Sequence, residues 1–371
     1  MSNMPKRYPL NGTFELTGRC NLTCKMCLVR VDSERITSLG ERERTAAEWI
    51  DMAKQAAEHG TLELLLTGGE VLLRKDFSEI YEAIAQMGFL LTVYTNATMV
   101  TDKVMELFRK YPPHKIGVTM YGASNATYER LCGCKDGYDR FIEGITKLRT
   151  LPSLFDLRTT IVKDNVEDLP AMKEFAKELL GDEKKLHISR FVCKAVRGGI
   201  CHPEEVRLSA SDSVRHTESY LLDLQNEVNE SMVLKHFFRP DVFSNSNRIS
   251  GVPVENRYLF SNCKAGIDQY SINWAGKMYA CELLSDGFTD PFKDGFMNAW
   301  KQLPSKYPMS KAIEACEECK YAVVCESCPA TRLAETGDWF GVPQYACEEA
   351  KLKYEIYNSM GWIHEGGENN E

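Results

Sequence analysis

Hydrophobic positions along the first 200 residues alternate between two patterns. Short apolar runs predict strands at residues 14–16, 62–66, 90–94, 116–120, 157–162 and 187–192. Between these runs, apolar residues recur at helical spacing and predict helices at residues 45–59, 76–87, 102–110, 124–131, 138–148 and 169–180. About six strand–helix units in succession are typical of βαβ connections, so the sequence predicts an α/β fold around a parallel sheet.

The alternation stops near residue 200, and the composition then changes. Residues 209–233 read as a polar helix, and residues 239–254 are rich in Ser, Asn, Arg and Pro, as in a connector. Seven of the 14 cysteines lie farther along, from Cys263 to Cys347. We therefore expect an α/β domain, a helical connecting segment, a cysteine-rich domain and a polar, disordered tail, at residues 1–208, 209–258, 259–360 and 361–371 respectively.

Charge and hydropathy exclude some classes of function. The 371 residues carry a formal net charge of −8, which does not favour nucleic acid as a partner. No apolar run approaches the roughly 18 residues that span a bilayer, and the first residues contain no apolar signal segment. We expect a cytoplasmic protein without a membrane partner, in which 14 cysteines favour metal or redox chemistry over disulfides.

Three cysteines follow the first predicted strand directly. Cys20, Cys24 and Cys27 are spaced C-x3-C-x2-C, in a loop past a strand's carboxyl end, where parallel sheets place their sites. Three thiolates at this spacing can hold three irons of a [4Fe–4S] cluster and leave the fourth iron open to another ligand. The alternatives are a zinc knuckle, although structural zinc usually has four ligands in paired motifs, or three buried cysteines.

The cysteine motif, with Met26 before Cys27, resembles the signature of the radical S-adenosylmethionine (SAM) enzymes. In that family SAM chelates the open iron, and one electron from the cluster cleaves it to a 5′-deoxyadenosyl radical. The resemblance implies a partial (β/α)6 barrel, which suits about six strand–helix units. It also implies SAM and a [4Fe–4S] cluster at the SAM site as cofactors, and oxygen sensitivity.

The same resemblance assigns residues to SAM binding. Gly68-Gly69-Glu70 is similar to the family's GGEP motif, which meets the methionyl amine of SAM, although Val71 stands where Pro is usual. Asn96, after the third predicted strand, would contact the ribose of SAM, and Arg158, on the fifth, the carboxylate. Each has a simpler alternative, because paired glycines commonly form turns and polar residues commonly cap strands.

The C-terminal cysteines resemble the SPASM extension of peptide- and protein-maturing radical SAM enzymes. By this resemblance a distal auxiliary [4Fe–4S] cluster would be held by Cys316, Cys319, Cys325 and Cys347. A proximal one would be held by Cys263, Cys281 and Cys328. Cys325-x2-Cys328 is one residue shorter than the family spacing, which puts the role of Cys328 in doubt. Two C-x2-C pairs alone would also suit a zinc ribbon.

Two expectations concern the substrate. The proximal set has three cysteines, so either Cys193, Cys201 or a residue other than Cys completes it, or one iron stays open for a substrate thiolate. The open iron would favour a thioether product. Glu282 resembles an acidic residue that accepts a proton near the substrate in some maturases; a surface carboxylate is the alternative.

The sequence therefore predicts an enzyme that abstracts hydrogen from a peptide or small-protein substrate and installs a thioether or another crosslink. An external reductant such as flavodoxin or ferredoxin would supply electrons, and a separate protein could read a leader peptide. One alternative is an anaerobic sulfatase-maturating, formylglycine-forming enzyme. Another is a non-catalytic iron–sulfur or zinc electron-transfer protein, which would have no use for Gly68-Gly69-Glu70.

Overall fold

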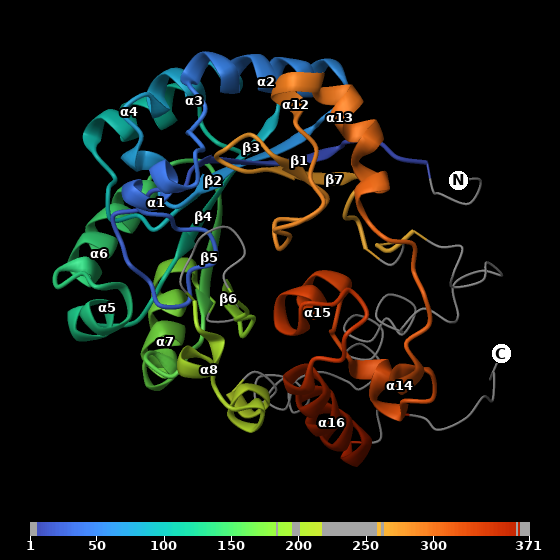
Figure 1. Ribbon diagram of the computed structural model, residues 1–371. Helices are drawn as coiled ribbons and strands as arrows, with labels where there is room; N and C mark the ends of the chain where they lie inside the picture. Colours follow the sequence, from blue (N-terminus) through green and yellow to red (C-terminus); the bar gives the residue numbers. More distant parts are fainter. Residues whose placement is uncertain are drawn as a thin grey trace, which may run out of the picture. The chain divides into compact units, whose positions relative to one another are not determined.

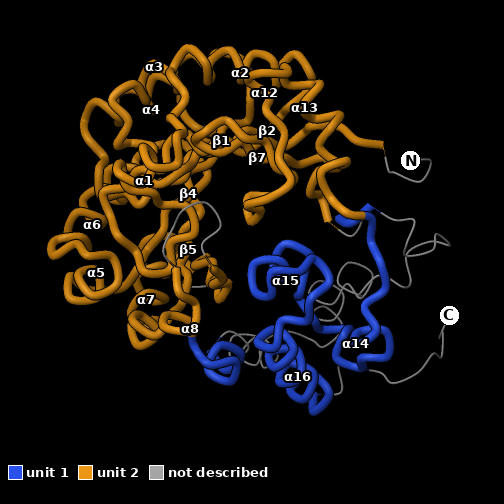
Figure 2. Tube along the Cα trace, in the orientation of Figure 1, with its two compact units in different colours: residues 1–4, 208–262, 309–371 blue, residues 5–207, 263–308 orange. Residues whose placement is uncertain are grey.

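The computed structural model describes residues 6–182, 185–194, 201–216, 258–260, 263–360 and 363. The chain divides into two compact units (Figure 2). The barrel unit consists of residues 5–207 and 263–308, and the C-terminal unit of residues 1–4, 208–262 and 309–371. Residues 263–308 thus share their contacts with the barrel unit, although the sequence grouped them with one C-terminal domain.

The barrel unit is built on one sheet. Its strands are β1 (Asn11–Thr17), β2 (Glu63–Gly68), β3 (Leu90–Thr95), β4 (Lys115–Thr119), β5 (Leu154–Thr160), β6 (Leu186–Ser189), β7 (Gln269–Ile272) and β8 (Met278–Tyr279). Their order is β6-β5-β4-β3-β2-β1-β7-β8. Strands β1 to β6 are parallel neighbours in chain order, which confirms the predicted α/β fold.

Strands β7 and β8 extend this sheet beyond β1. Strand β7 runs parallel to β1, and β8 returns antiparallel to β7. The turn between them contains Gly276 at φ 88°, a left-handed conformation that favours glycine. The sequence pattern did not predict these strands, because four and two residues are too short to display a period.

Helices cover the outer side of the curved sheet in the barrel unit (Figure 1). The main ones are α2 (Ala46–Glu58), α3 (Phe77–Ala85), α4 (Asp102–Lys110), α5 (Asn125–Cys132), α6 (Gly137–Leu148) and α7 (Leu169–Leu180). Shorter ones are α1 (Ser33–Ser38), η1 (Val71–Leu73), η2 (Val166–Asp168), α8 (Pro203–Val206), α12 (Pro291–Asp294), α13 (Phe296–Gln302) and η5 (Leu303–Lys306).

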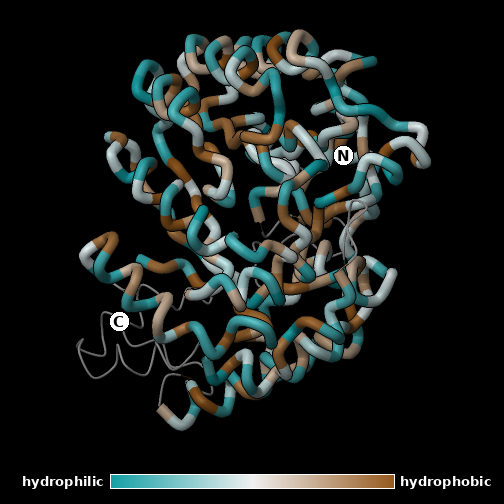
Figure 3. The backbone as a smooth tube through the Cα atoms, turned by 90° about the vertical axis from the view of Figure 1, so that its left-hand side faces the viewer, coloured by the Kyte–Doolittle hydropathy of each residue, from teal (hydrophilic) through white to brown (hydrophobic). Residues whose placement is uncertain are grey.

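Side chains on the strands alternate between the helices and the inner side of the sheet. In β2, Leu64 and Leu66 are buried, while Leu65 and Thr67 are half-buried. Hydrophobic and hydrophilic stretches accordingly alternate along the backbone (Figure 3). The inner side is therefore more polar than the helix-facing side and is available for a site.

Aromatic packing joins β1 to the helices above it. The Trp49 ring of α2 lies 5.0 Å from the Phe14 ring of β1 and 5.6 Å from the Phe292 ring of α12, centroid to centroid. Burying one such side chain contributes about 2–3 kcal/mol. Helix α2 begins at a capping box in which Thr45 and Glu48 exchange hydrogen bonds. The strand that precedes the cysteine loop thus rests on a rigid support.

The C-terminal unit is helical where it is described. It contains α14 (Glu314–Glu317), η6 (Lys320–Val324), α15 (Pro329–Thr336) and α16 (Gln344–Ser359). Its core consists of Val324 with Ala350, Tyr354 and Tyr357 of α16. The predicted connector at residues 239–254 lies outside the described residues, as do the tail except Ile363 and most of the helix predicted at 209–233. None of the described helices combines the length and the apolar character needed to cross a membrane.

Candidate active site

The cysteine loop leaves β1 in close backbone contact with the end of β2. Gly69 N donates to the Thr17 carbonyl oxygen at 2.8 Å, and Glu70 N donates to that of Arg19 at 2.9 Å. A Cβ at Gly68 would lie 2.3 Å from the Thr17 oxygen, and one at Gly69 would lie 2.2 Å from the Arg19 oxygen. Only glycine fits at either position, so the paired glycines allow β2 to hold the start of the loop.

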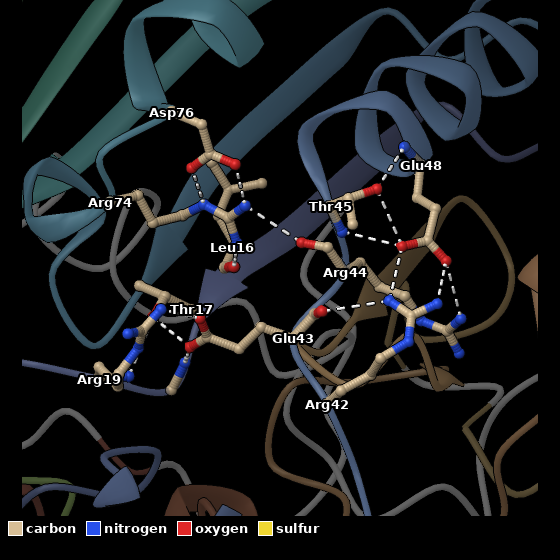
Figure 4. A network of polar contacts seen from close by, with 11 residues as sticks. Leu16, Thr17, Arg19, Arg42, Glu43, Arg44, Thr45, Glu48, Arg74 and Asp76 are labelled. Atoms are coloured by element: carbon tan, nitrogen blue, oxygen red, sulfur yellow. Dashed lines mark hydrogen bonds and ion pairs between the residues drawn. The ribbon is translucent and has the colours of Figure 1, made fainter.

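A buried arginine fixes the end of β1 (Figure 4). Arg74 donates through Nη1 to the Leu16 carbonyl oxygen at 2.5 Å and through Nη2 to that of Arg44 at 3.1 Å. Its guanidinium also pairs with Asp76 at 2.7 Å, and its side chain is 5% exposed. The strand end, the segment before α2 and the start of α3 are therefore joined through one cation.

Glu43 holds the next residues of the chain in the same network (Figure 4). Its carboxylate accepts hydrogen bonds from the Thr17 hydroxyl and from Gly18 N, the latter at 3.1 Å, and pairs with Arg19. Since Arg19 immediately precedes Cys20, this carboxylate fixes the backbone at the point where the cysteine loop begins.

The other side of the loop docks on the C-terminal end of α5. Thr23 N donates to the Cys132 carbonyl oxygen at 2.8 Å, and Lys25 N donates to that of Leu131 at 3.1 Å. Lys25 Nζ pairs with Asp164 at 2.7 Å. Carbonyl groups in the last turn of a helix lack helical partners, so the loop satisfies groups that would otherwise need water.

Polar groups are directed at two of the loop sulfurs. Cys20 Sγ accepts from Leu22 N at 3.4 Å and from Asn96 Nδ2 at 3.7 Å. Cys27 Sγ accepts from Arg30 N at 3.3 Å. Hydrogen bonds of this kind to thiolate sulfurs are one of the ways in which proteins tune iron–sulfur clusters.

The three loop thiols are buried together. Burial raises the pKa of Cys20 and Cys27, while a side-chain hydrogen bond with Cys132 and then burial raise that of Cys24. Without metal these side chains are therefore neutral thiols at pH 7, and metal coordination would remove their protons. Among the described residues no three Cys, His, Asp or Glu side chains converge on one metal ion. Three thiols in one loop, with N–H donors at their sulfurs, nonetheless fit the donor set of a [4Fe–4S] cluster with an open iron.

Glu70 is enclosed by protein donors. It is 1% exposed, and its carboxylate accepts from the Thr95 hydroxyl at 2.8 Å, Leu72 N at 3.0 Å and Asn96 N at 2.8 Å. Burial raises the pKa of Glu70, and these hydrogen bonds lower it. The side chain joins the ends of β2 and β3, and its contact with the SAM amine stays a prediction.

Asn96 forms a closed set of side-chain contacts with the cysteine loop. Its amide Nδ2 donates to Asn21 Oδ1 at 3.0 Å, and its Oδ1 accepts from Thr98 N at 2.9 Å. Asn21 Nδ2 donates to the Thr98 hydroxyl at 2.8 Å. Ala97, which lies between Asn96 and Thr98, has a φ of 61°. This backbone conformation is unfavourable for alanine, and residues strained in this way cluster at functional sites. The sequence did not lead us to Asn21 or Thr98. The position of Asn21 next to Cys20 was the one feature of the sequence that could have indicated its place in the site.

Arg158 lies among polar side chains on the inner side of the sheet. Its Nη2 donates to the Tyr94 hydroxyl at 2.7 Å and pairs with Asp156, and its guanidinium stacks 4.1 Å from the centre of the Tyr94 ring. Its Nε is buried and has no hydrogen-bond partner among the described residues. The ring of Tyr94 occupies the space that a Cβ at Gly117 would need. Sequence reasoning named Arg158 but missed Tyr94 and Asp156, which lie in register across the sheet.

Glu282 is exposed and belongs to the barrel unit. Its charge reaches Tyr94: burial chiefly raises the pKa of Tyr94, Arg158 lowers it, and Asp156 and Glu282 raise it further. The structure therefore brings Glu282 near the polar group around Arg158. Its role as a proton acceptor stays a prediction.

The four cysteines assigned to a distal cluster lie in the C-terminal unit. Burial raises the pKa of Cys316, Cys325 and Cys347, and their charges interact with one another and with Cys319. The nearby Arg332 lowers the pKa of the same three thiols. Four thiols beside a cation suit an anionic cluster with four thiolate ligands.

The remaining three predicted ligands are divided between the units. Cys263 is exposed and Cys281 half-buried in the barrel unit. Cys328 precedes α15 in the C-terminal unit, where its side chain accepts a hydrogen bond from the first turn of that helix. Their role as ligands of a second auxiliary cluster stays a prediction.

Comparisons with known proteins show which family and which relatives this chain is similar to. Residues 14–176 match the model of the Radical SAM superfamily. The chain is 26% identical over 357 residues to an AdoMet-dependent heme synthase of Methanosarcina barkeri, covering 93% of this chain and 97% of the synthase. It is 26% identical over 171 residues to PqqA peptide cyclase of Gluconobacter oxydans, covering 46% of this chain and 47% of the cyclase.

A solved structure shares the fold. Streptococcus suis SuiB bound to its precursor peptide SuiA superposes with a TM-score of 0.66 at 17% identity, covering 92% of this chain and 76% of SuiB. The family match spans most of β1, the cysteine loop and Gly68-Gly69-Glu70, which confirms the resemblance drawn from those motifs. The chain therefore contains a radical SAM domain at residues 14–176, and it shares the fold of SuiB.

Proposed function

We propose that this enzyme uses a SAM-derived radical to abstract hydrogen from a peptide or small-protein substrate and installs a thioether or another crosslink. The observation that carries the proposal is the pairing of two cysteine sets: three in the loop after β1, and four in the C-terminal unit, of which three interact with Arg332. Similarity to PqqA peptide cyclase and to SuiB, whose solved structure holds a precursor peptide, favours a peptide substrate.

The cluster of the cysteine loop, when bound, supplies the electron that cleaves SAM to the 5′-deoxyadenosyl radical. Around it, the backbone at Gly69 and Glu70 would receive the methionyl amine, and Asn96 would contact the ribose. Arg158 would take the SAM carboxylate, a role favoured by its buried Nε, which has no hydrogen-bond partner among the described residues. Tyr94 would orient the guanidinium through its ring and hydroxyl.

The crosslinking step must dispose of one proton and one electron. Hydrogen abstraction from a C–H bond gives 5′-deoxyadenosine and a carbon radical. Joining that carbon to a cysteine sulfur breaks the S–H bond and releases a proton and an electron. Glu282, whose charge acts on Tyr94, would take the proton. Cys316, Cys319, Cys325 and Cys347 would hold an auxiliary cluster that supplies the acceptor for the electron. Flavodoxin or ferredoxin would restore the electron consumed in SAM cleavage.

The test uses anaerobically reconstituted enzyme, SAM, dithionite and cysteine-containing peptides. We expect 5′-deoxyadenosine and a peptide product lacking two hydrogens, with deuterium passing from labelled peptide into 5′-deoxyadenosine. Replacing Cys20, Cys24 and Cys27 by Ala should abolish both products. A formylglycine product would support the sulfatase-maturating alternative instead, and SAM cleavage that never transfers deuterium from any peptide would contradict the proposal.

The proton acceptor has its own test. Glu282→Gln should slow formation of the crosslinked product about a hundred- to ten-thousandfold, as loss of general-base catalysis does. SAM cleavage in the same reactions should change little. Glu282→Asp, which keeps the carboxylate, is the control. Equal loss of product and of SAM cleavage in Glu282→Gln would remove Glu282 from this role.

A second candidate substrate is an iron tetrapyrrole. It is favoured by the match to the heme synthase, which extends over 93% of this chain, whereas the match to the peptide cyclase covers 46%. The radical would then abstract hydrogen from the tetrapyrrole instead of from a peptide. Incubation with a deuterium-labelled iron porphyrin separates the candidates: transfer of deuterium from the porphyrin into 5′-deoxyadenosine supports this one, and unchanged porphyrin beside a modified peptide excludes it.

A further inference from the structure

Cys132 is a cysteine outside every predicted ligand set, yet its side chain contacts a cluster ligand. It is the last residue of α5 and is fully buried. Its side chain packs in one apolar cluster with Cys24, Leu22 and Met26, and its interaction with Cys24 raises the pKa of the Cys24 thiol. The environment of the Cys24 sulfur therefore includes a second thiol.

The backbone keeps Cys132 at this position. Its carbonyl oxygen accepts from Thr23 N at 2.8 Å and from the Thr23 hydroxyl at 3.1 Å. Helix α5 then ends at Gly133 with φ 67°, where a Cβ would lie 2.3 Å from the Thr23 hydroxyl oxygen. Because Thr23 adjoins Cys24, these contacts fix the two cysteines relative to each other.

Tyr121 supplies a second group at the same sulfur. Its side chain packs against the apolar cluster that contains Cys24, and it lowers the pKa of the Cys24 thiol. Its carbonyl oxygen accepts from Asn165 Nδ2 at 2.9 Å, and its ring packs edge-on against Tyr128 with centroids 5.8 Å apart. The phenol is therefore held in place by the β4–α5 connection rather than by the cysteine loop.

We propose that the Cys132 thiol and the Tyr121 hydroxyl donate hydrogen bonds to the Cys24 sulfur and raise the reduction potential of the cluster held by the loop. Cluster sulfurs carry negative charge that increases on reduction, so donors at a sulfur stabilise the reduced state. Cys20 and Cys27 accept from backbone N–H groups and the Asn96 amide. The proposal rests on a cluster in the loop and is independent of the substrate class.

The test measures the potential of the loop cluster by spectroscopic redox titration, in enzyme whose C-terminal set Cys316, Cys319, Cys325 and Cys347 is replaced by Ser. Cys132→Ala and Tyr121→Phe each remove a donor while leaving the three ligands. We expect each to retain iron and to reduce the fraction of reduced cluster at a fixed potential by about tenfold, as loss of a charge-assisted hydrogen bond would. Cys132→Ser keeps a donor and should stay close to the parent.

A control variant and the outcomes that would overturn the proposal complete the test. Cys134→Ala is the control, because that thiol contacts Asp136 at 3.4 Å and should leave the potential unchanged. A full iron content with an unchanged potential in both Cys132→Ala and Tyr121→Phe would overturn the proposal. Loss of iron in Cys132→Ala and an altered cluster spectrum in Cys132→Ser would also overturn it, since Cys132 would then be a ligand. Failure of the parent to bind a cluster would instead contradict the assignment of the loop.

Discussion

The paired glycines after β2 show how one motif can serve two purposes. Family resemblance assigns Gly68 and Gly69 to SAM binding, where a bare backbone can approach a ligand. In the structure both residues already approach protein: the carbonyl oxygens of Thr17 and Arg19 occupy the places of their missing side chains. Their first effect is therefore on the shape of the cysteine loop.

The consequence can be measured in Gly69→Ala. A methyl group 2.2 Å from a backbone oxygen must displace the segment that leads to Cys20, so we expect iron in the loop to be largely lost even without SAM. Gly181→Ala is the matched control, because its φ of 76° makes alanine unfavourable there too but no atom lies within 4 Å. Normal iron content with weakened SAM binding alone in Gly69→Ala would contradict this role.

Arg158 permits a second test at this scale. If its guanidinium holds the SAM carboxylate, Arg158→Gln should weaken SAM binding by about tenfold or more, because a charge-assisted pair is lost. Tyr94→Phe keeps the ring under the guanidinium and should weaken SAM binding less. Equilibrium binding of SAM to reconstituted enzyme checks both. Unchanged affinity in Arg158→Gln would point to another partner for the buried Nε.

At the scale of elements, the cysteine loop is held from opposite sides by segments distant in sequence. The residues before Cys20 are fixed by Arg74 and Glu43 (Figure 4), and those after it by the end of α5. The loop itself has no helix or strand of its own. Its conformation is therefore set by neighbouring elements.

At the scale of elements, we predict how the loss of Arg74 changes the stability of the fold. Arg74→Ala removes a buried cation and its hydrogen bonds to Leu16 and Arg44, and should lower the free energy of unfolding by about 3 kcal/mol. Arg140→Ala is the control, since its pair with Asp136 is exposed to solvent and should contribute little to stability. Denaturant unfolding of metal-free protein measures both. Equal effects of the two substitutions would show that the network does not stabilise the strand end.

Helices and strands could be predicted from the sequence where burial of one face makes apolar residues recur at a fixed spacing. The six parallel strands each bury one face against helices, so apolar runs marked them, with ends displaced by a few residues. Strands β7 and β8 were missed because they are short. The contact between Thr23 and Cys132 joins residues 109 apart in sequence, and nothing in the local pattern of either one indicates it. The cysteines could thus be proposed as ligands from their spacing, whereas the polar groups around them could be found only from the fold.

At the scale of the whole molecule, the two cysteine sets belong to different compact units. Cys20, Cys24 and Cys27 lie in the barrel unit, and Cys316, Cys319, Cys325 and Cys347 lie in the C-terminal unit. Each set has its own supports: Asn96 and the end of α5 for the first, and Arg332 for the second. We therefore expect the two sites to bind iron independently while acting in sequence during turnover.

Reciprocal variants test this independence. Replacing the four C-terminal cysteines by Ser should remove about four irons per chain, the content of one cubane, and replacing the three loop cysteines by Ala should remove about four others. Only the loop variant should lose reductive SAM cleavage. The C-terminal variant should still form 5′-deoxyadenosine but no crosslinked product, because the electron released in crosslinking has no acceptor. Full product formation without the C-terminal irons would instead assign that unit a structural role.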